Sequence, residues 1–548
     1  MVSSGDTLWG YTKLLVSLAM PMIAAAIFNQ AGSMATVIFI GQYTSPEYIG
    51  AAVLSNMLCN ITGYSLAYGM IGSLDTLVAQ AYGAKQYKYM GLITQRAMTI
   101  LTIAVIPVMF LWRYSTSYIL KTLLLIDPII ADYANQYANY LLLGLWPMIM
   151  NEILKKFLIN QNIIIPQIIS SFFSLLVNLG CNYLFISYLN YGFIGAAMTT
   201  AVVNWFLLVS LVMLMVIRKK YVYHQRQNNK QVKYIALVNQ KRQQPESIGP
   251  DTEDDSDPII EDNCDSMCDS MLDIKKENCI EDPIENIDLS ENNLLDENTI
   301  KAGTTIKDED DPENNWPDIN VENILSDWYP FLALGIPGAV SLFLEWGSFE
   351  MAAGIAGQLG TSNLAVHSIY MQTAAILYMT PLAIASATSI CVGNYIGAKK
   401  YQCAKEMVSL GMWIDVALGF LAGLFLLALR NYWGTFFSND SEVIGLVKKY
   451  MPIMLLYCIV DASKCITLNV LRSTGRPQIT VIFNFVSCIV VLLPLGWYLA
   501  IYLDFKLYGL WGSMSAAWGL CTLIYLYFIV NTKWEDQRFV DEKNSIIH

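Results

Sequence analysis

Long apolar stretches alternate with short polar connections along most of the chain. Twelve of these stretches are at least about as long as the roughly 20 mostly apolar residues that a helix needs to cross the hydrocarbon layer. Several are longer than one crossing requires, which indicates tilt or extension beyond the bilayer. The pattern predicts an all-α membrane protein with twelve transmembrane helices in two six-helix bundles. The stretches run approximately over residues 11–40, 49–79, 91–112, 137–158, 163–187, 192–217, 329–357, 363–391, 403–430, 444–469, 477–503 and 508–531.

Composition supports a membrane protein. The chain is 55% hydrophobic and 14% charged, with a mean hydropathy of +0.42, which is too apolar for one soluble core of this size. The N-terminal residues lack the basic region and cleavage site of a signal peptide, so we expect the first apolar stretch to be a retained span. We expect a transporter and not an enzyme, with no cofactor, no metal site and no nucleic-acid partner.

The placement of basic residues predicts the orientation. An even number of spans puts both termini on one side, and most Lys and Arg residues outside the insert lie on that side. By the positive-inside rule this face, the termini and the central insert are cytoplasmic. The membrane itself is either the plasma membrane or that of an acidic organelle. The basic residues of this face are Lys85, Lys88, Arg96, Lys155, Lys156, Arg218 to Lys220, Lys399, Lys400, Lys405, Arg472, Arg476 and Lys533.

The polar insert carries the acidic charge of the whole chain. Between Glu246 and Glu322 there are 26 Asp and Glu against four Lys and Arg, whereas the net charge of the whole chain is -12. The rest of the chain is therefore net basic. Few large apolar residues in this segment predict a disordered cytoplasmic linker. The predicted domains are residues 1–217 and 326–534 as six-helix bundles, 218–325 as the linker, and 535–548 as a cytoplasmic tail.

Short motifs in the insert and in one outer loop bear on metal binding and modification. The stretch "CDSMCDSM" offers two Cys residues, too few for a structural zinc site, which needs four ligands. Ser266 and Ser270 each precede an Asp by three residues, a pattern typical of acidophilic kinase sites. A regulatory partner or kinase and an inert linker both fit, and we expect deletion of 246–315 to leave transport intact. Asn439 begins an N-glycosylation sequon in a predicted outer loop.

The two halves repeat each other. Five short anchors recur in the same order at offsets of 311 to 317, among them "YGAKQY" with "IGAKKY" and "YGFIGAA" with "YGLWGSM". Each unit has an even number of spans, so the units are parallel repeats related by an axis along the membrane normal. Such pairs commonly form two bundles around a cavity that opens alternately to each side.

Two carboxylates fall near the predicted middle of the membrane. Glu345 lies in the seventh span and Asp461 in the tenth, and Glu350 lies nearer the outer end of the seventh. A charge at the centre of a membrane helix costs at least about 2.5–3.5 kcal/mol, so such residues usually face an ion or substrate path. A carboxylate that holds either a proton or a cation predicts antiport. The alternative is that Glu345 and Asp461 are neutral interhelical hydrogen-bonding groups.

Two further charged residues bear on this site. Lys464, three residues after Asp461, lies on a neighbouring helix face and is a possible counter-charge that neutralises Asp461. In that case Glu345 alone carries the proton. Asp415 in the ninth span is expected to be a hydrogen-bonded structural residue or to lie near the cytoplasmic interface, and a transport role is the less favoured alternative.

Several motifs resemble the multidrug and toxic compound extrusion (MATE) family, in its eukaryotic branch. They are "GSLDTLVAQAYGAKQ" (72–86), "LEWGSFE" (344–350), "VGNYIGA" (392–398) and "VLRSTGRPQ" (470–478), and the resemblance covers nearly everything except the insert. It implies a proton-driven exporter of cations, with Glu345, Glu350 and Asp461 at the acidic positions of the family.

This chain departs from the family pattern at two positions, and the resemblance also indicates residues that line the substrate path. Animal members carry a Glu where this chain has Gln372, and small or apolar residues are expected at the position of Lys464. Aromatic side chains near the acids can stack on organic cations. The substrate-lining candidates are Trp346, Gln372, Tyr370 and Tyr378.

The leading hypothesis is a proton-coupled antiporter that exports organic cations, drugs or metabolites by alternating access. Alternatives are a flippase for lipids or lipid-linked sugars, sodium-coupled antiport, and a channel or membrane scaffold for the insert. Sodium coupling stays open because carboxylates also bind hard cations.

Overall fold

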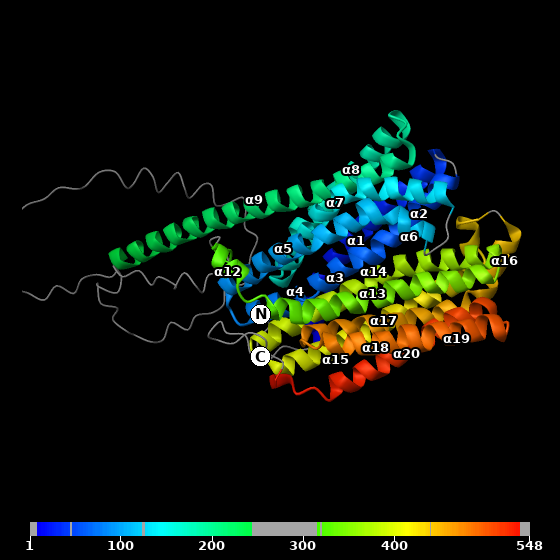
Figure 1. The fold of residues 1–548 in the computed structure, drawn as a ribbon. Helices are drawn as coiled ribbons and strands as arrows, with labels where there is room; N and C mark the ends of the chain where they lie inside the picture. Colours follow the sequence, from blue (N-terminus) through cyan, green and yellow to red (C-terminus); the bar gives the residue numbers. More distant parts are fainter. Residues whose placement is uncertain are drawn as a thin grey trace, which may run out of the picture. The chain divides into compact units, whose positions relative to one another are not determined.

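The computed structural model describes residues 8–43, 46–122, 127–243, 315–317, 320–438 and 440–536. The chain divides into two compact units, one formed by residues 1–219 with 307–548 and the other by residues 220–306. The described part of the first unit is built from helices (Figure 1).

The N-terminal half of the first unit contains six membrane-crossing segments, three of which include π-helical turns. Such turns are inserted in longer helices and shift the faces of the helix that follows. In chain order the segments are α1 (Leu8–Tyr43); α2 (Pro46–Cys59), η1 (Asn60–Tyr64), α3 (Ser65–Ile71) and α4 (Leu74–Gly83); α5 (Tyr87–Phe110), η2 (Leu111–Ser115) and α6 (Thr116–Thr122); α7 (Pro128–Asn160); α8 (Ile165–Asn182) and η3 (Tyr183–Tyr188); and α9 (Gly192–Gln243).

The C-terminal half repeats this order of six segments. A short helix, α12 (Val321–Leu325), precedes it. The segments are α13 (Tyr329–Gln358); α14 (Thr361–Gly397); α15 (Tyr401–Leu429); α16 (Ser441–Tyr450) with α17 (Pro452–Ser473), after the 3-10 turn η6 (Trp433–Phe436); α18 (Pro477–Phe485), η7 (Val486–Leu492), α19 (Leu493–Trp497) and η8 (Tyr498–Tyr502); and α20 (Lys506–Val530), followed by η9 (Trp534–Asp536).

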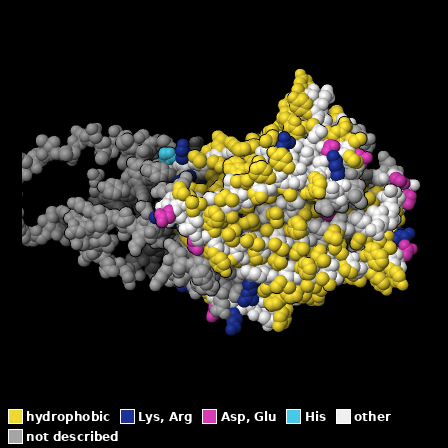
Figure 2. Space-filling view, in the orientation of Figure 1, with side chains coloured by type: hydrophobic (Ala, Val, Ile, Leu, Met, Phe, Trp, Pro, Cys, Tyr) yellow, Lys and Arg dark blue, Asp and Glu magenta, His cyan; other side chains and the backbone are white. Residues whose placement is uncertain are grey.

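Ten helical stretches of the described residues are long and apolar enough to cross a membrane. The other two segments of the twelve, residues 46–83 and 128–160, are less uniform: the first is interrupted between α3 and α4, and the second carries Glu152, Lys155 and Lys156. Large apolar side chains such as Ile27, Val37 and Phe110 are exposed on the surface. Figure 2 shows apolar side chains over most of the visible face and charged ones toward its two ends, as expected for lipid contact.

We call the end of the helices that carries Lys85, Lys399 and Arg476 the basic end, and the opposite end the far end. Several contacts show that these basic connections lie together. A guanidinium nitrogen of Arg476 donates to Thr532 Oγ1 at 3.3 Å, and the rings of Tyr11 and Tyr395 lie 6.4 Å apart. The predicted repeat extends to the backbone here, because Lys85 and Lys399 both adopt a φ of 60°.

The first helices of the two halves each pack partly on the other half. The start of α1 shares a buried cluster with α14, α15 and α17, through Leu15 and Ala19 among others. The start of α13 joins the core of the N-terminal half through Phe331 and Leu334. Because α1 and α13 are repeat partners, this exchange follows the predicted pseudo-two-fold symmetry.

The halves meet at the basic end along five glycines that we call the glycine seam: Gly69, Gly83, Gly338, Gly393 and Gly397. A Cβ atom at Gly83 would overlap the Asn394 carbonyl, and one at Gly397 would overlap the Gln80 carbonyl. These two contacts are repeat-related. Small residues let helix backbones approach closely in membrane proteins, and the seam uses this to bring α4 against α14 and α3 against α13.

Hydrogen bonds across the halves accompany the seam. Thr76 Oγ1 donates to the carbonyl oxygen of Arg472, and Gln80 Nε2 donates to that of Ser473 at 3.3 Å. The basic end is therefore closed between α4 and the α14–α17 pair in this conformation.

The insert differs in part from the expectation of a disordered linker beginning at residue 218. Residues 218–243 continue α9 as helix. The physical reason is composition: this stretch has no Gly or Pro and is rich in Lys, Arg and Gln, which favour helix. Residues 244–314, which include Ser266 and Ser270, and Asn439 lie outside the described residues, so the expectations for them stay predictions.

Candidate functional site

The predicted acids lie on two helices of the C-terminal half. Glu345 occupies the middle of α13, whose first turn contains Pro330 and whose C-terminal end is followed by Gly360 at a φ of 100°. Asp461 lies in α17, which begins at Pro452. Proline fits the first turn of a helix because its missing N–H has no intrahelical acceptor there. Both acids are half-buried.

An ion pair joins α13 to α17. Lys464 Nζ lies 2.9 Å from Glu345 Oε1, with the lysine side chain 2% exposed and the glutamate side chain 12% exposed. Glu345 Oε2 has no hydrogen-bond partner among the described residues. One carboxylate oxygen is thus paired with the ammonium, and the other is buried without a hydrogen-bond partner among the described residues.

Lys464 is a possible counter-charge to Asp461, but in this conformation its ion pair is with Glu345 across the helix interface. The physical reason is packing, because α13 faces Lys464 directly, whereas Asp461 lies three residues earlier on the same helix. Asp461 remains within electrostatic range of both Lys464 and Glu345.

An indole ring completes this group. The Lys464 ammonium lies 4.0 Å from the centroid of the Trp518 ring, in the geometry of a cation–π contact. Trp518 is fully buried in α20 and also lies beside Asp461. We call Glu345, Asp461, Lys464 and Trp518 the acid cluster. Trp518 was missed in the sequence because an aromatic residue in an apolar helix carries no signal of its own.

Of the predicted lining residues, Tyr378 lies near the acid cluster and Trp346 borders the N-terminal half. Tyr378 is half-buried in α14, within electrostatic range of Glu345 and Asp461, and its hydroxyl oxygen accepts from Cys465 Sγ at 3.4 Å. Trp346 is half-buried and its ring lies 6.2 Å from that of Tyr68 in α3, so it borders the N-terminal half.

The structure does not bring Tyr370 to the site. Tyr370 is fully buried, donates its hydroxyl to the carbonyl of Val447 at 2.7 Å and packs edge-on against Trp511, so its expected lining role is wrong and it is a core residue. Gln372 is exposed on α14. Glu350, one and a half turns beyond Glu345, is half-buried and forms no hydrogen bond or ion pair among the described residues.

Asp415 differs from the expectation of a hydrogen-bonded structural residue. Its side chain is completely buried in α15, and neither carboxyl oxygen has a partner among the described residues. Asp461 and Cys465 lie within its electrostatic range.

At the basic end, Asp75 pairs with Lys156, Oδ2 to Nζ 2.8 Å, and is 96% buried. This pair ties α4 to α7 within the N-terminal half. Asp75 is therefore part of the framework of the closed end.

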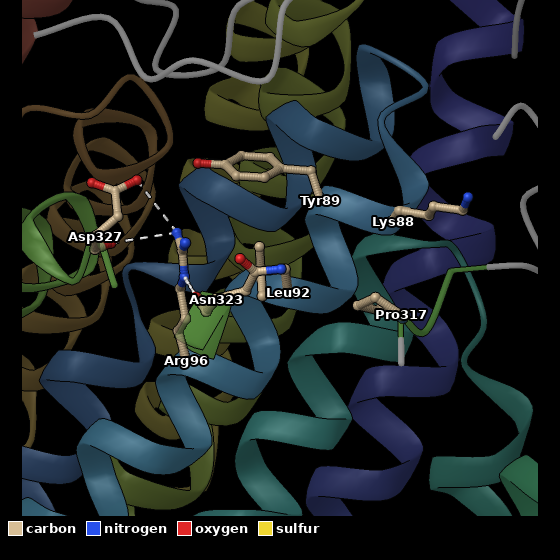
Figure 3. A pocket seen from close by; sticks show the side chains of 7 residues that line it. All are labelled: Lys88, Tyr89, Leu92, Arg96, Pro317, Asn323 and Asp327. Atoms are coloured by element: carbon tan, nitrogen blue, oxygen red, sulfur yellow. Dashed lines mark hydrogen bonds and ion pairs between the residues drawn. The ribbon is translucent and has the colours of Figure 1, made fainter. Parts of the chain in front are cut away.

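A separate cavity of about 270 Å³ lies at the basic end, away from the acid cluster. Figure 3 shows its lining, where Arg96 reaches from α5 toward Asn323 and Asp327. Arg96 Nε donates to the Asn323 carbonyl at 3.0 Å, and Nη1 lies 3.4 Å from Asp327 Oδ2. The cavity forms where the segment before α13 crosses α5. No group of three or more potential metal ligands occurs among the described residues.

Comparison with known proteins agrees with this architecture. The MatE family model matches residues 21–184 and 337–498, one range in each half. Multidrug and toxin extrusion protein 1 of Homo sapiens is 25% identical over 95% of this chain and 75% of that protein. Protein DETOXIFICATION 49 of Arabidopsis thaliana is 24% identical over 95% of this chain and 86% of that protein.

Solved structures show the same fold. The eukaryotic MATE transporter AtDTX14 superposes with a TM-score of 0.75 at 22% identity, covering 97% of this chain and 98% of that one. A MATE transporter of Vibrio cholerae gives a TM-score of 0.69 at 14% identity, covering 96% and 99%. With its two matched halves and twelve membrane-crossing segments, the chain belongs to the MATE family of secondary transporters.

Proposed function

We propose that this transporter exports organic cations, drugs or metabolites in exchange for protons, by alternating access. Glu345 and Asp461 are the acids at which a proton and a cationic cargo exclude each other, and Glu350 assists nearer the far end. Trp346 and Tyr378 line the cargo path. The observation that supports the proposal is the acid cluster, in which Glu345 and Asp461 interact electrostatically within the membrane-crossing part of the C-terminal half.

The physical basis is the high energy of charge in a membrane. A charged side chain at the centre of a membrane helix costs at least about 2.5–3.5 kcal/mol, so carboxylates are retained there when they bind protons or ions. A carboxylate oxygen that carries a proton no longer attracts a cation. Glu345 Oε2 is buried and has no hydrogen-bond partner among the described residues, which supports a role in binding a proton.

The available energy is sufficient for export. A proton gradient supplies about 1.4 kcal/mol per pH unit, and a membrane potential adds about 2.3 kcal/mol per 100 mV for each net charge that crosses, as when a neutral metabolite is exchanged for a proton. Tenfold accumulation of a solute costs about 1.4 kcal/mol. One proton per cycle therefore supports tenfold export at a gradient of about one pH unit.

The closed basic end supports alternating access. The glycine seam brings the two halves into backbone contact there, and a repeat-related pair of bundles can separate at such a seam. We place the basic end in the cytoplasm on the positive-inside rule.

Proteoliposomes with an imposed pH gradient test the proposal. We expect transport of tetraethylammonium by the wild type to follow the pH gradient and to ignore a sodium gradient. Glu345→Gln and Asp461→Asn should each lower the rate at least tenfold, with melting temperatures near that of the wild type.

Three outcomes contradict the proposal. Normal transport by both variants makes the acids structural. Transport that follows a sodium gradient instead of a proton gradient means that sodium is the coupling ion. Movement of a fluorescent lipid between leaflets without any cation transport favours a flippase.

A further inference from the structure

Lys464 places a positive charge inside the proposed cargo site. Its ammonium is held between Glu345 Oε1 at 2.9 Å and the Trp518 ring at 4.0 Å, and its side chain is 2% exposed. Asp461 lies within electrostatic range of the same ammonium. The acid cluster thus contains two carboxylates and one cation supplied by the chain itself.

We propose that Lys464 is a tethered cation that moves between Glu345 and Asp461 and couples proton binding at the first to cargo release at the second. The inference rests on the proposed function. When Glu345 is ionised, Lys464 pairs with it and Asp461 is free to bind a cationic cargo. When a proton binds to Glu345, the ammonium pairs with Asp461 and excludes the cargo.

Two physical facts make this exchange favourable. A buried ammonium without a counter-charge is very unfavourable, so loss of the Glu345 charge forces Lys464 to find another carboxylate. Asp461, three residues earlier on α17, lies on a neighbouring face of the helix within reach of the flexible four-carbon lysine stem.

Trp518 permits the movement. Its ring attracts the ammonium by a cation–π contact that does not depend on the protonation of either acid. Trp518 also lies near Asp461, so the ring contacts the ammonium close to both carboxylates.

Lys464 is the cation in direct contact with Glu345. Arg472, about two turns farther along α17, acts on Tyr525, which also interacts with Glu345. The residues that interact electrostatically with Glu345 include Tyr378, Tyr457, Asp461, Lys464, Cys465, Cys488, Cys521 and Tyr525.

The exchange fixes the charge of the cargo. With Glu345 neutralised by Lys464, Asp461 provides one uncompensated negative charge, so the site takes cargo with a single positive charge. Each cycle then exchanges one proton for one monocation, and the charge of the acid cluster plus its ligand is the same in both states. A dication lacks a second free carboxylate.

A rescue experiment separates this inference from direct competition at Glu345. In Glu345→Gln, which is permanently neutral, Lys464 should pair with Asp461 and weaken equilibrium binding of tetraethylammonium at least tenfold. In the double variant Glu345→Gln/Lys464→Met, binding should return to within about threefold of wild type. The rescued binding should lose its dependence on pH and disappear when Asp461→Asn is added.

Matched controls keep the test decisive. The double variant replaces both members of a buried ion pair by neutral groups, a change that is often neutral or stabilising, and its melting temperature checks folding. Glu345→Gln/Lys405→Met removes an exposed lysine instead and should stay weak. Lys464→Met alone should improve binding of the dication methyl viologen relative to tetraethylammonium.

The outcomes distinguish the two proposals. If the wild type neither binds nor transports tetraethylammonium, the proposed function fails and this inference fails with it. If the wild type transports the cation but the folded double variant does not bind it, Glu345 contacts cargo directly, and the tethered-cation inference alone is overturned.

Discussion

Asp415 is a buried acid with no visible compensation. Its carboxyl group is fully enclosed, and both oxygens lack hydrogen-bond partners among the described residues. An isolated ionised carboxylate in an apolar interior is far more costly than a neutral one, so the group is expected to be protonated. Even then its oxygens accept no hydrogen bond from a described residue, so we expect the group to destabilise the C-terminal half.

We therefore expect Asp415→Leu to stabilise the protein. Removal of an unsatisfied buried polar group should recover about 1–3 kcal/mol, seen as a higher melting temperature of the purified transporter in detergent. Asp415→Asn, which keeps a polar group of the same size, is the matched control and should give little gain. A lower melting temperature for Asp415→Leu would mean that the carboxyl group has a stabilising partner.

At the level of single residues, the sequence reveals where charged side chains lie but not which residues they contact. Glu345 and Asp461 were predictable because a carboxylate in an apolar run is visible in one dimension. The ion pair of Glu345 with Lys464, the indole of Trp518 beneath it and the burial of Tyr370 depend on how α13, α14, α17 and α20 pack. That packing has no signature at the individual residue.

Among the elements, α4 and α14 form the tightest part of the closed basic end. Gly83 and Gly397 each face a backbone carbonyl of the other helix, at Asn394 and Gln80. Any side chain at these positions must push the two halves apart. The close contact between α4 and α14 stabilises the conformation with a closed basic end. A substitution that disrupts this contact therefore favours a conformation in which the basic end is open.

Gly397→Ala and Gly397→Leu should shift the population toward that open conformation, with Leu having the larger effect. Overpacking typically costs about 1–3 kcal/mol, which corresponds to a change in the equilibrium of about fivefold to about 150-fold. Spin labels at positions 88 and 405, which are exposed at the basic end of the two halves, should report longer distances. Gly180→Leu, where a Cβ meets nothing within 4 Å, is the control. Unchanged distances in Gly397→Leu would remove the seam from the gating mechanism.

The element pattern was largely predictable from hydrophobicity and repeats. Length and apolar content located the membrane-crossing segments, and the repeated "YGAKQY" and "IGAKKY" motifs correspond to the matching turns at Lys85 and Lys399. The extension of α9 to Gln243 was not foreseen, because its polar composition was taken as a sign of disorder although its residues favour helix.

On the scale of the whole molecule, the end of the insert is attached to the N-terminal half. We call residues 315–317 and 320–328 the strap. Asn315 Nδ2 donates to Gln161 Oε1 at 2.6 Å, and the Trp316 ring packs edge-on against Phe157 at 5.4 Å. Arg96 binds Asn323 and Asp327, in the part of the strap nearest α13. The strap leads directly into α13, which carries Glu345.

This attachment changes the expected effect of removing the insert. A deletion of 246–315 would take out Asn315 and its hydrogen bond, so the dispensable part must end before the strap. We expect replacement of residues 251–311 by a Gly-Ser segment of equal length to leave transport and melting temperature unchanged. Trp316→Ala should lower stability by about 1–3 kcal/mol, through loss of its contact with Phe157.

Transport measurements on the same variants decide whether the strap does more than stabilise. The strap holds the start of α13 on the N-terminal half, where Phe331 and Leu334 join its core, while the acid cluster lies farther along the same helix. Movement of the halves must therefore bend or tilt α13 between these two attachments. Arg96→Ala should loosen the first attachment and alter the transport rate without changing tetraethylammonium binding at the acid cluster. If a variant loses both tetraethylammonium binding and transport rate, the strap acts on the acid cluster itself.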